Sequence, residues 1–240
     1  GFQLTLWLMA GALFVVLLSG MLTMRQDLGR SKAKVKFKQL FSKSREVNYL
    51  SFARFFLFGS RDIWFVVGLP VFLKETLNWS FAAVGAFMAA WIIGYGLVQA
   101  GAPAILRQGG AHSALRWAGI LTAVTASLAL AVEVEFHLGI VVLAGLAVFG
   151  AVFAVNSAVH SYLILAYTDS DNVTLNVGFY YMANAGGRLI GTLLSGVVYV
   201  SHGLPGCLWV STGFVAVATG LTALLPRQAK SEDLLAAAEK

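Results

Sequence analysis

The sequence predicts an all-α membrane protein with seven transmembrane helices. Of its 240 residues, 58% are hydrophobic and only 12% are charged, whereas soluble domains are about one quarter charged. The apolar residues lie in blocks of about 20, the length that a helix needs to cross the hydrocarbon core of a bilayer. No alternating strand pattern competes, and in lipid a helix satisfies its own backbone hydrogen bonds.

Seven apolar spans follow one another along the chain. They cover residues 2–24, 49–73, 81–106, 114–132, 136–166, 177–200 and 204–225. We therefore expect four parts: a first helix (1–24), a basic loop (25–48), a six-helix bundle (49–225) and a polar tail (226–240). Because the chain begins with Gly1 rather than Met, we expect it to be a fragment of a longer protein.

The positive charges of the loops predict how the spans cross the membrane. The loop 25–48 carries eight Lys and Arg residues, and thirteen of the 17 in the chain lie on its side of the predicted topology. The opposite side carries only Lys74, and the other three lie inside spans. Cytoplasmic loops carry the excess of Lys and Arg, so we expect an outer N-terminus and a cytoplasmic C-terminus.

The second span is unusual because it contains three charged residues, Arg54, Arg61 and Asp62. Each charge at mid-membrane costs roughly 2.5–3.5 kcal/mol on insertion scales, so such residues face a protein interior or a water-filled cavity. Arg54 and Arg61 are seven apart and share one helix face. Asp62 can partly neutralise Arg61. The group is either an ion pair between helices or part of a binding site.

Polar residues recur at helical spacing in two later spans. Asn156 and His160 are four residues apart in the fifth span, and Asn184 and Arg188 repeat that spacing in the sixth, with Tyr181 one turn earlier. These side chains either line a cavity or form hydrogen bonds between helices, and both interpretations stay open.

A stripe of small residues also lies on the sixth span. Gly187, Gly191 and Ser195 repeat every four residues, which is typical of closely packed membrane helices. The stripe is turned by about 100° from Arg188. One face of this helix can therefore pack against a neighbour while the next face lines a cavity.

Together, the intramembrane charges favour a binding site for a small anion. Guanidinium groups present forked donors that suit phosphate and carboxylate oxygens. Asp62 and His160 can bind and release protons and are candidates for proton coupling. The predicted substrate-binding residues are Arg54, Arg61, Arg188, Asn156, Asn184 and Tyr181.

The sequence offers no motif for an enzyme. It has no Cys/His spacing for a metal, no phosphate-binding glycine loop and no nucleophilic serine elbow. We therefore predict no catalytic residue, metal or cofactor. The basic residues cluster beside apolar spans, which indicates a membrane protein rather than one that binds nucleic acid.

This pattern resembles the C-terminal half of a major facilitator superfamily transporter. In that family, two six-helix halves are joined by a long basic cytoplasmic loop, which the loop 25–48 matches here. The resemblance implies that span 2–24 is the sixth helix of the full protein and that an N-terminal half precedes it. It also implies that spans 49–73 and 136–166 line a central cavity.

Two segments suggest a narrower resemblance. The run RFFLFGSRDIWFVVGLPVF (residues 54–72) resembles the seventh helix of the organoarsenical exporters of bacterial arsenic-resistance operons, and GLVQAGAP (96–103) is similar to the end of their next helix. The resemblance implies secondary active export of 1-arseno-3-phosphoglycerate across the bacterial inner membrane. It also implies a functional link to the glyceraldehyde-3-phosphate dehydrogenase that makes this ester.

In that interpretation, Arg61 and Arg188 hold the anion. Arg54 guides it from the cytoplasmic side, and Asp62 balances Arg61 and exchanges a proton. Two alternatives remain: a major facilitator transporter for another phosphorylated or carboxylate anion, and a seven-helix receptor. The receptor fits the helix number, although no Lys lies inside a span to hold retinal.

Overall fold

The computed structural model describes residues 2–23, 44–105, 110–168 and 173–226. All regular secondary structure in these residues is helical, which confirms the predicted all-α class. The chain divides into two compact units, Gly1–Gln39 and Leu40–Lys240. Residues 227–240 of the predicted tail and residues 24–43 of the predicted basic loop and its edge lie outside the described residues.

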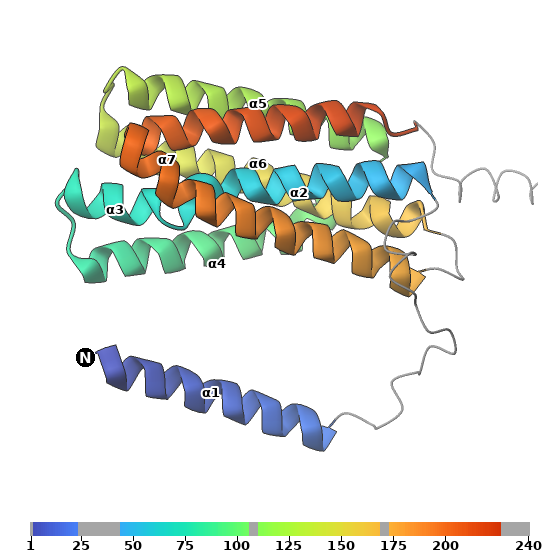
Figure 1. Ribbon diagram of the computed structural model, residues 1–240, viewed down its shortest axis with the longest axis horizontal. Helices are drawn as coiled ribbons and strands as arrows, with labels where there is room; N and C mark the ends of the chain where they lie inside the picture. Colours follow the sequence, from blue (N-terminus) through green and yellow to red (C-terminus); the bar gives the residue numbers. More distant parts are fainter. Residues whose placement is uncertain (1, 24–43, 106–109, 169–172, 227–240) are drawn as a thin grey trace, which may run out of the picture. The chain divides into compact units, whose positions relative to one another are not determined.

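The first unit contains one described helix, α1 (Phe2–Thr23), labelled in Figure 1. Its bounds agree with the first predicted span. Large apolar side chains are exposed on every side of it, including Trp7, Phe14 and Leu22. A helix that is apolar all round belongs in a lipid or protein environment rather than in water.

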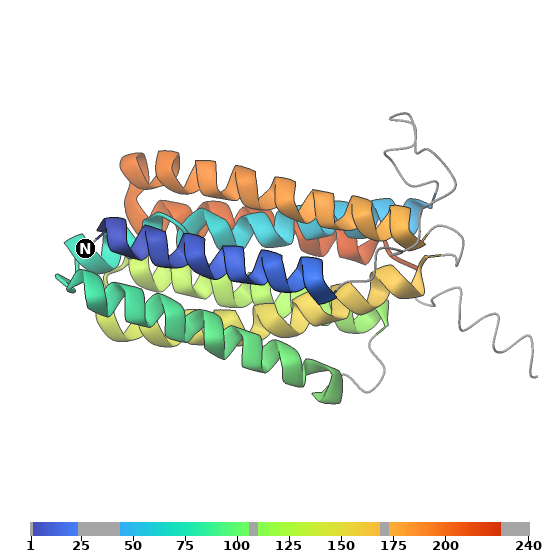
Figure 2. The same cartoon turned by 90° about the horizontal axis from the view of Figure 1, so that it is seen from below.

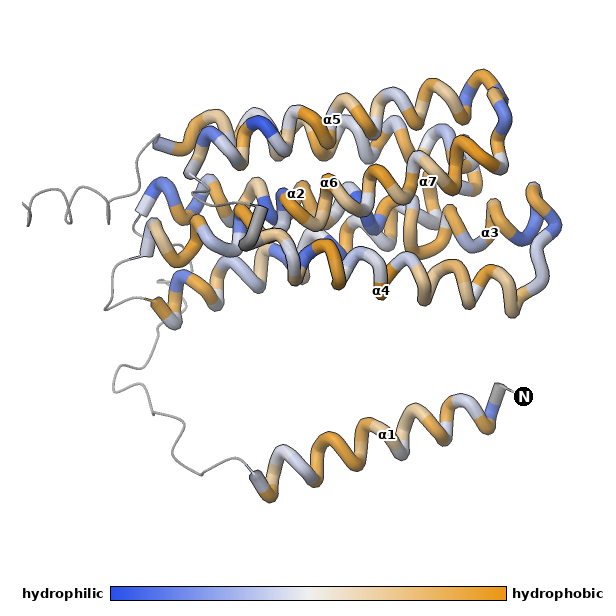
Figure 3. Tube along the Cα trace, turned by 180° about the vertical axis from the view of Figure 1, so that it is seen from behind, coloured by the Kyte–Doolittle hydropathy of each residue, from blue (hydrophilic) through white to orange (hydrophobic). Residues whose placement is uncertain are grey.

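The second unit is a helical bundle (Figures 1 and 2). Its helices are α2 (Arg45–Phe65), α3 (Gly68–Glu75), α4 (Phe81–Ile105), α5 (Ala111–Glu133), α6 (Leu138–Ala166) and α7 (Val173–Ala223). Figure 3 shows that these helices are mainly hydrophobic along their length, with short hydrophilic patches. Six helices of the described residues, counting α2 and α3 as one, are long and apolar enough to cross a membrane.

The predicted second span is not one continuous helix, which corrects the sequence-based expectation. The helix stops after Phe65, and α3 starts at Gly68. Pro70 lies just beyond the break; it has no N–H to donate to the carbonyl of Val66, four residues earlier. The hydroxyl of Ser195 accepts hydrogen bonds from the backbone N–H groups of Val67 (3.2 Å) and Gly68 (3.1 Å). The break is therefore stabilised from a neighbouring helix.

Helix α7 contains the two last predicted spans. It turns back at Gly203, whose φ of 61° and ψ of −162° are not helical, and Pro205 follows. Figure 1 shows residues 204–223 lying beside α5, where the hydroxyls of Thr122 and Thr219 are 3.0 Å apart. Because glycine tolerates positive φ, Gly203 allows α7 to fold into two antiparallel helices. The prediction of two spans is therefore correct.

Helix α2 is the most enclosed part of the bundle. In the most apolar stretch of the α2–α3 span, 67% of residues are buried, against 11% for α4. Trp64 packs edge-to-face against Phe149 of α6 (5.0 Å between ring centroids) and Trp91 of α4 (6.0 Å). Of the charged residues inside this span, Arg54 and Asp62 are buried within the protein and the Arg61 side chain is only 13% exposed.

The stripe of small residues packs against α2, as predicted. A Cβ atom on Gly187 would overlap with the carbonyl oxygen of Phe55, and one on Gly191 would lie 2.5 Å from the carbonyl oxygen of Gly59. Such distances are possible only without side chains. The first half of α7 (residues 173–202) and α2 thus approach backbone to backbone.

Candidate functional site

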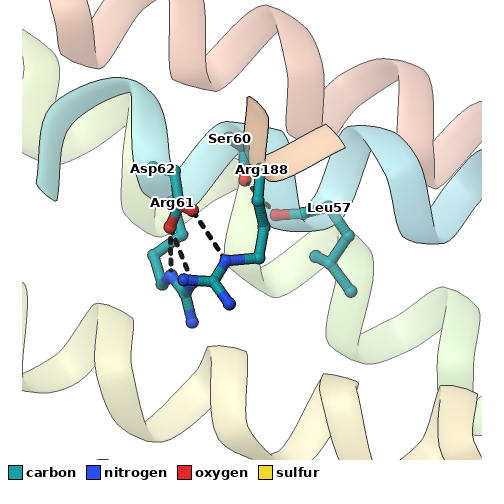
Figure 4. Close-up of polar contacts among 5 residues, drawn as sticks. All are labelled: Leu57, Ser60, Arg61, Asp62 and Arg188. Atoms are coloured by element: carbon teal, nitrogen blue, oxygen red, sulfur yellow. Dashed lines mark hydrogen bonds and ion pairs between the residues drawn. The ribbon is translucent and has the colours of Figure 1, made fainter. Parts of the chain in front are cut away.

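Three charged residues meet where α2 and α7 are in contact. The carboxylate of Asp62 accepts a hydrogen bond at Oδ1 from Arg61 Nε (2.7 Å), and an Arg61 terminal nitrogen lies 2.6 Å from the same oxygen. Arg188 donates from Nε to the other oxygen, Oδ2, at 3.0 Å. Figure 4 shows both guanidinium groups converging on this one carboxylate. We call these three residues the Asp62 cluster.

The close helix packing places Arg188 in this cluster. Gly187 and Gly191 lie on either side of Arg188 along α7, and a Cβ on Gly191 would lie only 3.1 Å from Cβ of Asp62. The backbone of α7 is therefore near enough for the Arg188 side chain to reach Asp62. Residues 126 apart in the sequence meet for this reason.

The cluster has a buried side and an open side. The side chain of Asp62 is 1% exposed and that of Arg61 is 13% exposed, but that of Arg188 is 56% exposed. One carboxylate faces two guanidinium groups, so the cluster has a formal charge of +1. The open side of Arg188 can therefore donate to an incoming anion.

A second group of polar residues is centred on Arg54, about two turns before Arg61 on the same face of α2. Arg54 is buried and donates from one terminal nitrogen to the carbonyl oxygen (3.1 Å) and hydroxyl (3.0 Å) of Ser157 on α6. Its guanidinium carbon lies 3.9 Å from the ring centroid of Phe58 and 4.9 Å from that of Tyr180. Arg54 is thus held between α2, α6 and α7.

Asn156 and His160 line α6 beside Ser157. Both side chains are completely buried, and no polar atom of either forms a hydrogen bond within the described residues. The described residues therefore show no hydrogen bond from either side chain to a neighbouring helix, which was the alternative interpretation of the sequence. His160 is close enough to Arg54 to interact with it electrostatically, and Asn156 directly precedes Ser157, the residue that accepts hydrogen bonds from Arg54.

The other two predicted site residues, Tyr181 and Asn184, form no hydrogen bond to either group within the described residues, although Tyr181 is close enough to Arg54 to interact with it electrostatically. Tyr181 is 54% exposed and contacts Tyr180 edge-to-face, with 5.6 Å between the ring centroids. Asn184 lies one turn before Arg188 on α7, is partly buried, and has no hydrogen bond to its Oδ1 within the described residues. Of the six predicted substrate-binding residues, only Arg61 and Arg188 share a bonding partner in the described residues.

Sequence reasoning missed Phe58. Its ring lies 3.9 Å from the guanidinium carbon of Arg54 and 5.2 Å from that of Arg61, so this ring contacts both arginines. The signal was in the spacing, because Phe58 follows Arg54 by four residues and precedes Arg61 by three, and such residues are neighbours on a helix.

The family comparison decides the class of protein. The family model for the Major Facilitator Superfamily matches residues 50–240. This chain belongs to the major facilitator superfamily. The comparison with curated proteins gave no match. The superfamily consists of secondary transporters with many membrane-spanning helices, so the receptor alternative is set aside. Its members are generally not enzymes.

Membership of the superfamily gives the two polar groups a context. Both groups are centred on α2, the helix most enclosed by its neighbours in this transporter bundle, and they extend to α6 and α7. Among the described residues, no group of three or more His, Cys, Asp or Glu side chains could hold a metal ion. The guanidinium groups of Arg61 and Arg188 present forked donors of the kind that suit phosphate and carboxylate oxygens.

Proposed function

We propose that this major facilitator transporter exports a small organic anion, with 1-arseno-3-phosphoglycerate as its substrate, and so confers resistance to arsenate. The observation that carries the anion is the Asp62 cluster, in which two guanidinium groups share one carboxylate and one of them is more than half exposed. The likeness of residues 54–72 and 96–103 to the organoarsenical exporters supports the substrate.

Each member of the Asp62 cluster has a role in the proposal. Arg188 and Arg61 bind the phosphate, arsenate or carboxylate oxygens through their forked donors. Asp62 neutralises one of the two positive charges while the site is empty, which limits the cost of keeping both inside the membrane. When the substrate binds, its oxygens compete with Asp62, and the released carboxylate becomes a candidate for proton exchange, as does the buried His160.

The transport cycle needs a second half of the protein. Alternating access in this superfamily moves one half against the other around a site near the middle of the membrane. We propose that an N-terminal half completes the cavity above the open side of Arg188. The protein would lie in the bacterial inner membrane with a cytoplasmic C-terminus, where Arg54, nearer the start of α2, meets the substrate first.

The decisive experiment is a survival assay. The full-length gene is expressed in an arsenate-sensitive bacterium, with and without the glyceraldehyde-3-phosphate dehydrogenase. Survival on arsenate should require both genes, because the dehydrogenase supplies the ester that the transporter removes. Absence of protection with both genes present would contradict the proposed substrate.

Point variants connect the assay to the site. Arg61→Ala and Arg188→Ala should each abolish protection at equal expression. Arg116→Ala is the matched control, since Arg116 is an exposed arginine at the start of α5. Full protection by the Arg61 and Arg188 variants would show that these side chains do not bind the substrate.

A second candidate is a transporter for another phosphorylated or carboxylate anion. The same guanidinium pair favours it, because phosphate and carboxylate groups both accept forked hydrogen bonds from arginine. Uptake of radiolabelled 3-phosphoglycerate into inverted vesicles that contain the full-length transporter, without any arsenate protection in cells, would favour this candidate.

A further inference from the structure

We propose that Arg54, together with Ser157, Asn156 and His160, forms a second anion-binding position, separate from the Asp62 cluster. Its ligand is either a small inorganic anion or the second charged group of a substrate that also binds at Arg61 and Arg188. The first form is independent of the proposed function, and the second form rests on it.

The charge balance around Arg54 is the first observation. Arg54 is only 4% exposed. Both ion pairs found in the described residues belong to Asp62, so Arg54 has no acidic partner there. A buried charge without a partner is strongly destabilising. The Phe58 and Tyr180 rings and the Ser157 oxygens offset part of this cost but supply no negative charge.

The unused hydrogen-bonding groups are the second observation. Within the described residues, Arg54 Nε, both polar atoms of Asn156 and both ring nitrogens of His160 have no partner, although all are buried. Buried polar groups in native proteins are normally paired. His160 is also close enough to Arg54 for the two to interact electrostatically. A position with a guanidinium, an amide N–H and an imidazole, but no carboxylate, suits an anion.

The distance to the Asp62 cluster is the third observation. Because Phe58 lies 3.9 Å from the Arg54 guanidinium carbon and 5.2 Å from that of Arg61, the two carbons are no more than about 9 Å apart across the ring. This upper limit is within the span of a three-carbon molecule that has a charged group hydrogen-bonded at each end. One such molecule could reach both positions if the Phe58 side chain turned aside.

The first arm of the test uses chloride alone. The full-length transporter is purified, and its Tm is measured while sodium gluconate is replaced by sodium chloride at constant ionic strength. In the inorganic form of the proposal, chloride raises the Tm of the wild type. It also raises the Tm of the control Arg116→Gln, which removes the same charge as Arg54→Gln but at an exposed position. The Tm shift is absent in Arg54→Gln and reduced in Asn156→Leu. Because Asn156→Leu keeps the charge of Arg54, it still tests the proposal if Arg54→Gln fails to fold.

The second arm compares two substrates. The binding of 3-phosphoglycerate, which is charged at both ends, is measured against that of glycerol 3-phosphate, which is charged at one. In the substrate form of the proposal, the wild type prefers 3-phosphoglycerate by about tenfold, the effect expected of one additional charge-assisted hydrogen bond. Arg54→Gln and Asn156→Leu lose this preference, and Arg116→Gln keeps it.

Each outcome gives a decision. A chloride shift that depends on Arg54 establishes an inorganic anion, and a two-ended preference that depends on Arg54 establishes the substrate's second group. If the wild type shows neither effect, or if Arg54→Gln retains both, the second anion-binding position is overturned. If neither three-carbon probe binds, the proposed substrate class fails, and the chloride arm still decides the second position without any substrate.

Discussion

At the scale of single residues, Asp62 has the most constrained position. Its carboxylate is buried, and both its oxygens are occupied by guanidinium groups from different helices. Removing one member of a buried ion pair leaves an uncompensated charge, which is usually worse than removing both. The cluster therefore depends on Asp62 more than on either arginine alone.

The substitution Asp62→Asn tests this dependence. It raises the formal charge of the cluster from +1 to +2, so we expect the empty full-length transporter to lose several degrees of Tm. Added 3-phosphoglycerate should restore more stability in Asp62→Asn than in the wild type, because it replaces the missing negative charge. Asp62→Glu, which keeps the charge, is the control. Equal Tm values for Asp62→Asn and the wild type would show that the carboxylate does not hold the cluster together.

At the scale of elements, the contact between α2 and α7 determines which side chains meet. Gly187 and Gly191 let the two backbones touch, and Ser195 supports the break between α2 and α3 from the same stripe. Because the three positions are spaced by four residues, they form one line along α7. A change at any of them acts on the charged cluster through the helix packing.

Gly187→Ala should be strongly destabilising, since its Cβ would overlap with the carbonyl oxygen of Phe55. We expect a loss of roughly 1–3 kcal/mol from overpacking, together with reduced transport because Arg188 moves away from Asp62. Gly196→Ala is a matched control on the same helix, as its Cβ would meet nothing within 4 Å. Thermal unfolding of both variants checks this; equal Tm values would contradict the close approach.

Ser195→Ala should weaken the α2–α3 junction. The substitution leaves the N–H groups of Val67 and Gly68 without their acceptor, and an unsatisfied buried donor costs about 1–3 kcal/mol. Hydrogen exchange at these two amides should therefore be faster in the variant. Ser201→Ala, at an exposed serine later on the same helix, should leave their exchange unchanged.

At the scale of the whole molecule, the proposed function makes the described bundle one side of a transport pathway. Helix α2 is enclosed by α4, α6 and α7, and Arg188 remains open on the bundle surface. In that proposal the open side of Arg188 faces the second half of the transporter, because the two halves of such proteins lie on either side of the substrate site.

The orientation of the bundle in the membrane can be tested directly. The excess of Lys and Arg on one side predicts a cytoplasmic C-terminus. In a bacterial host, green fluorescent protein fused after Lys240 should fluoresce, and alkaline phosphatase fused at the same place should be inactive, because the phosphatase needs the oxidising periplasm to form its disulfides. The reverse result would invert the predicted topology.

The sequence alone was sufficient for the class of protein and for most helix positions. Long apolar blocks predict membrane helices because a backbone in lipid has no other way to pair its polar groups. The break between α2 and α3 was missed, although Pro70 was visible, because proline also occurs inside continuous membrane helices. The tertiary contact that stabilises this break comes from Ser195, 127 residues away from Gly68 in the sequence.

For the site, the sequence determined which residues are chemically exceptional, and the tertiary structure decided which of them act together. Helical periodicity places Arg54, Arg61 and Phe58 on one face of α2, since that relation is local. It carries no information on distances between helices. The close contact at Gly187 and Gly191 brings Arg188 to Asp62. The packing of α6 against α2 places Ser157 where it accepts a hydrogen bond from Arg54. Two groups thus arise from one predicted site, because contacts between helices depend on how the side chains pack.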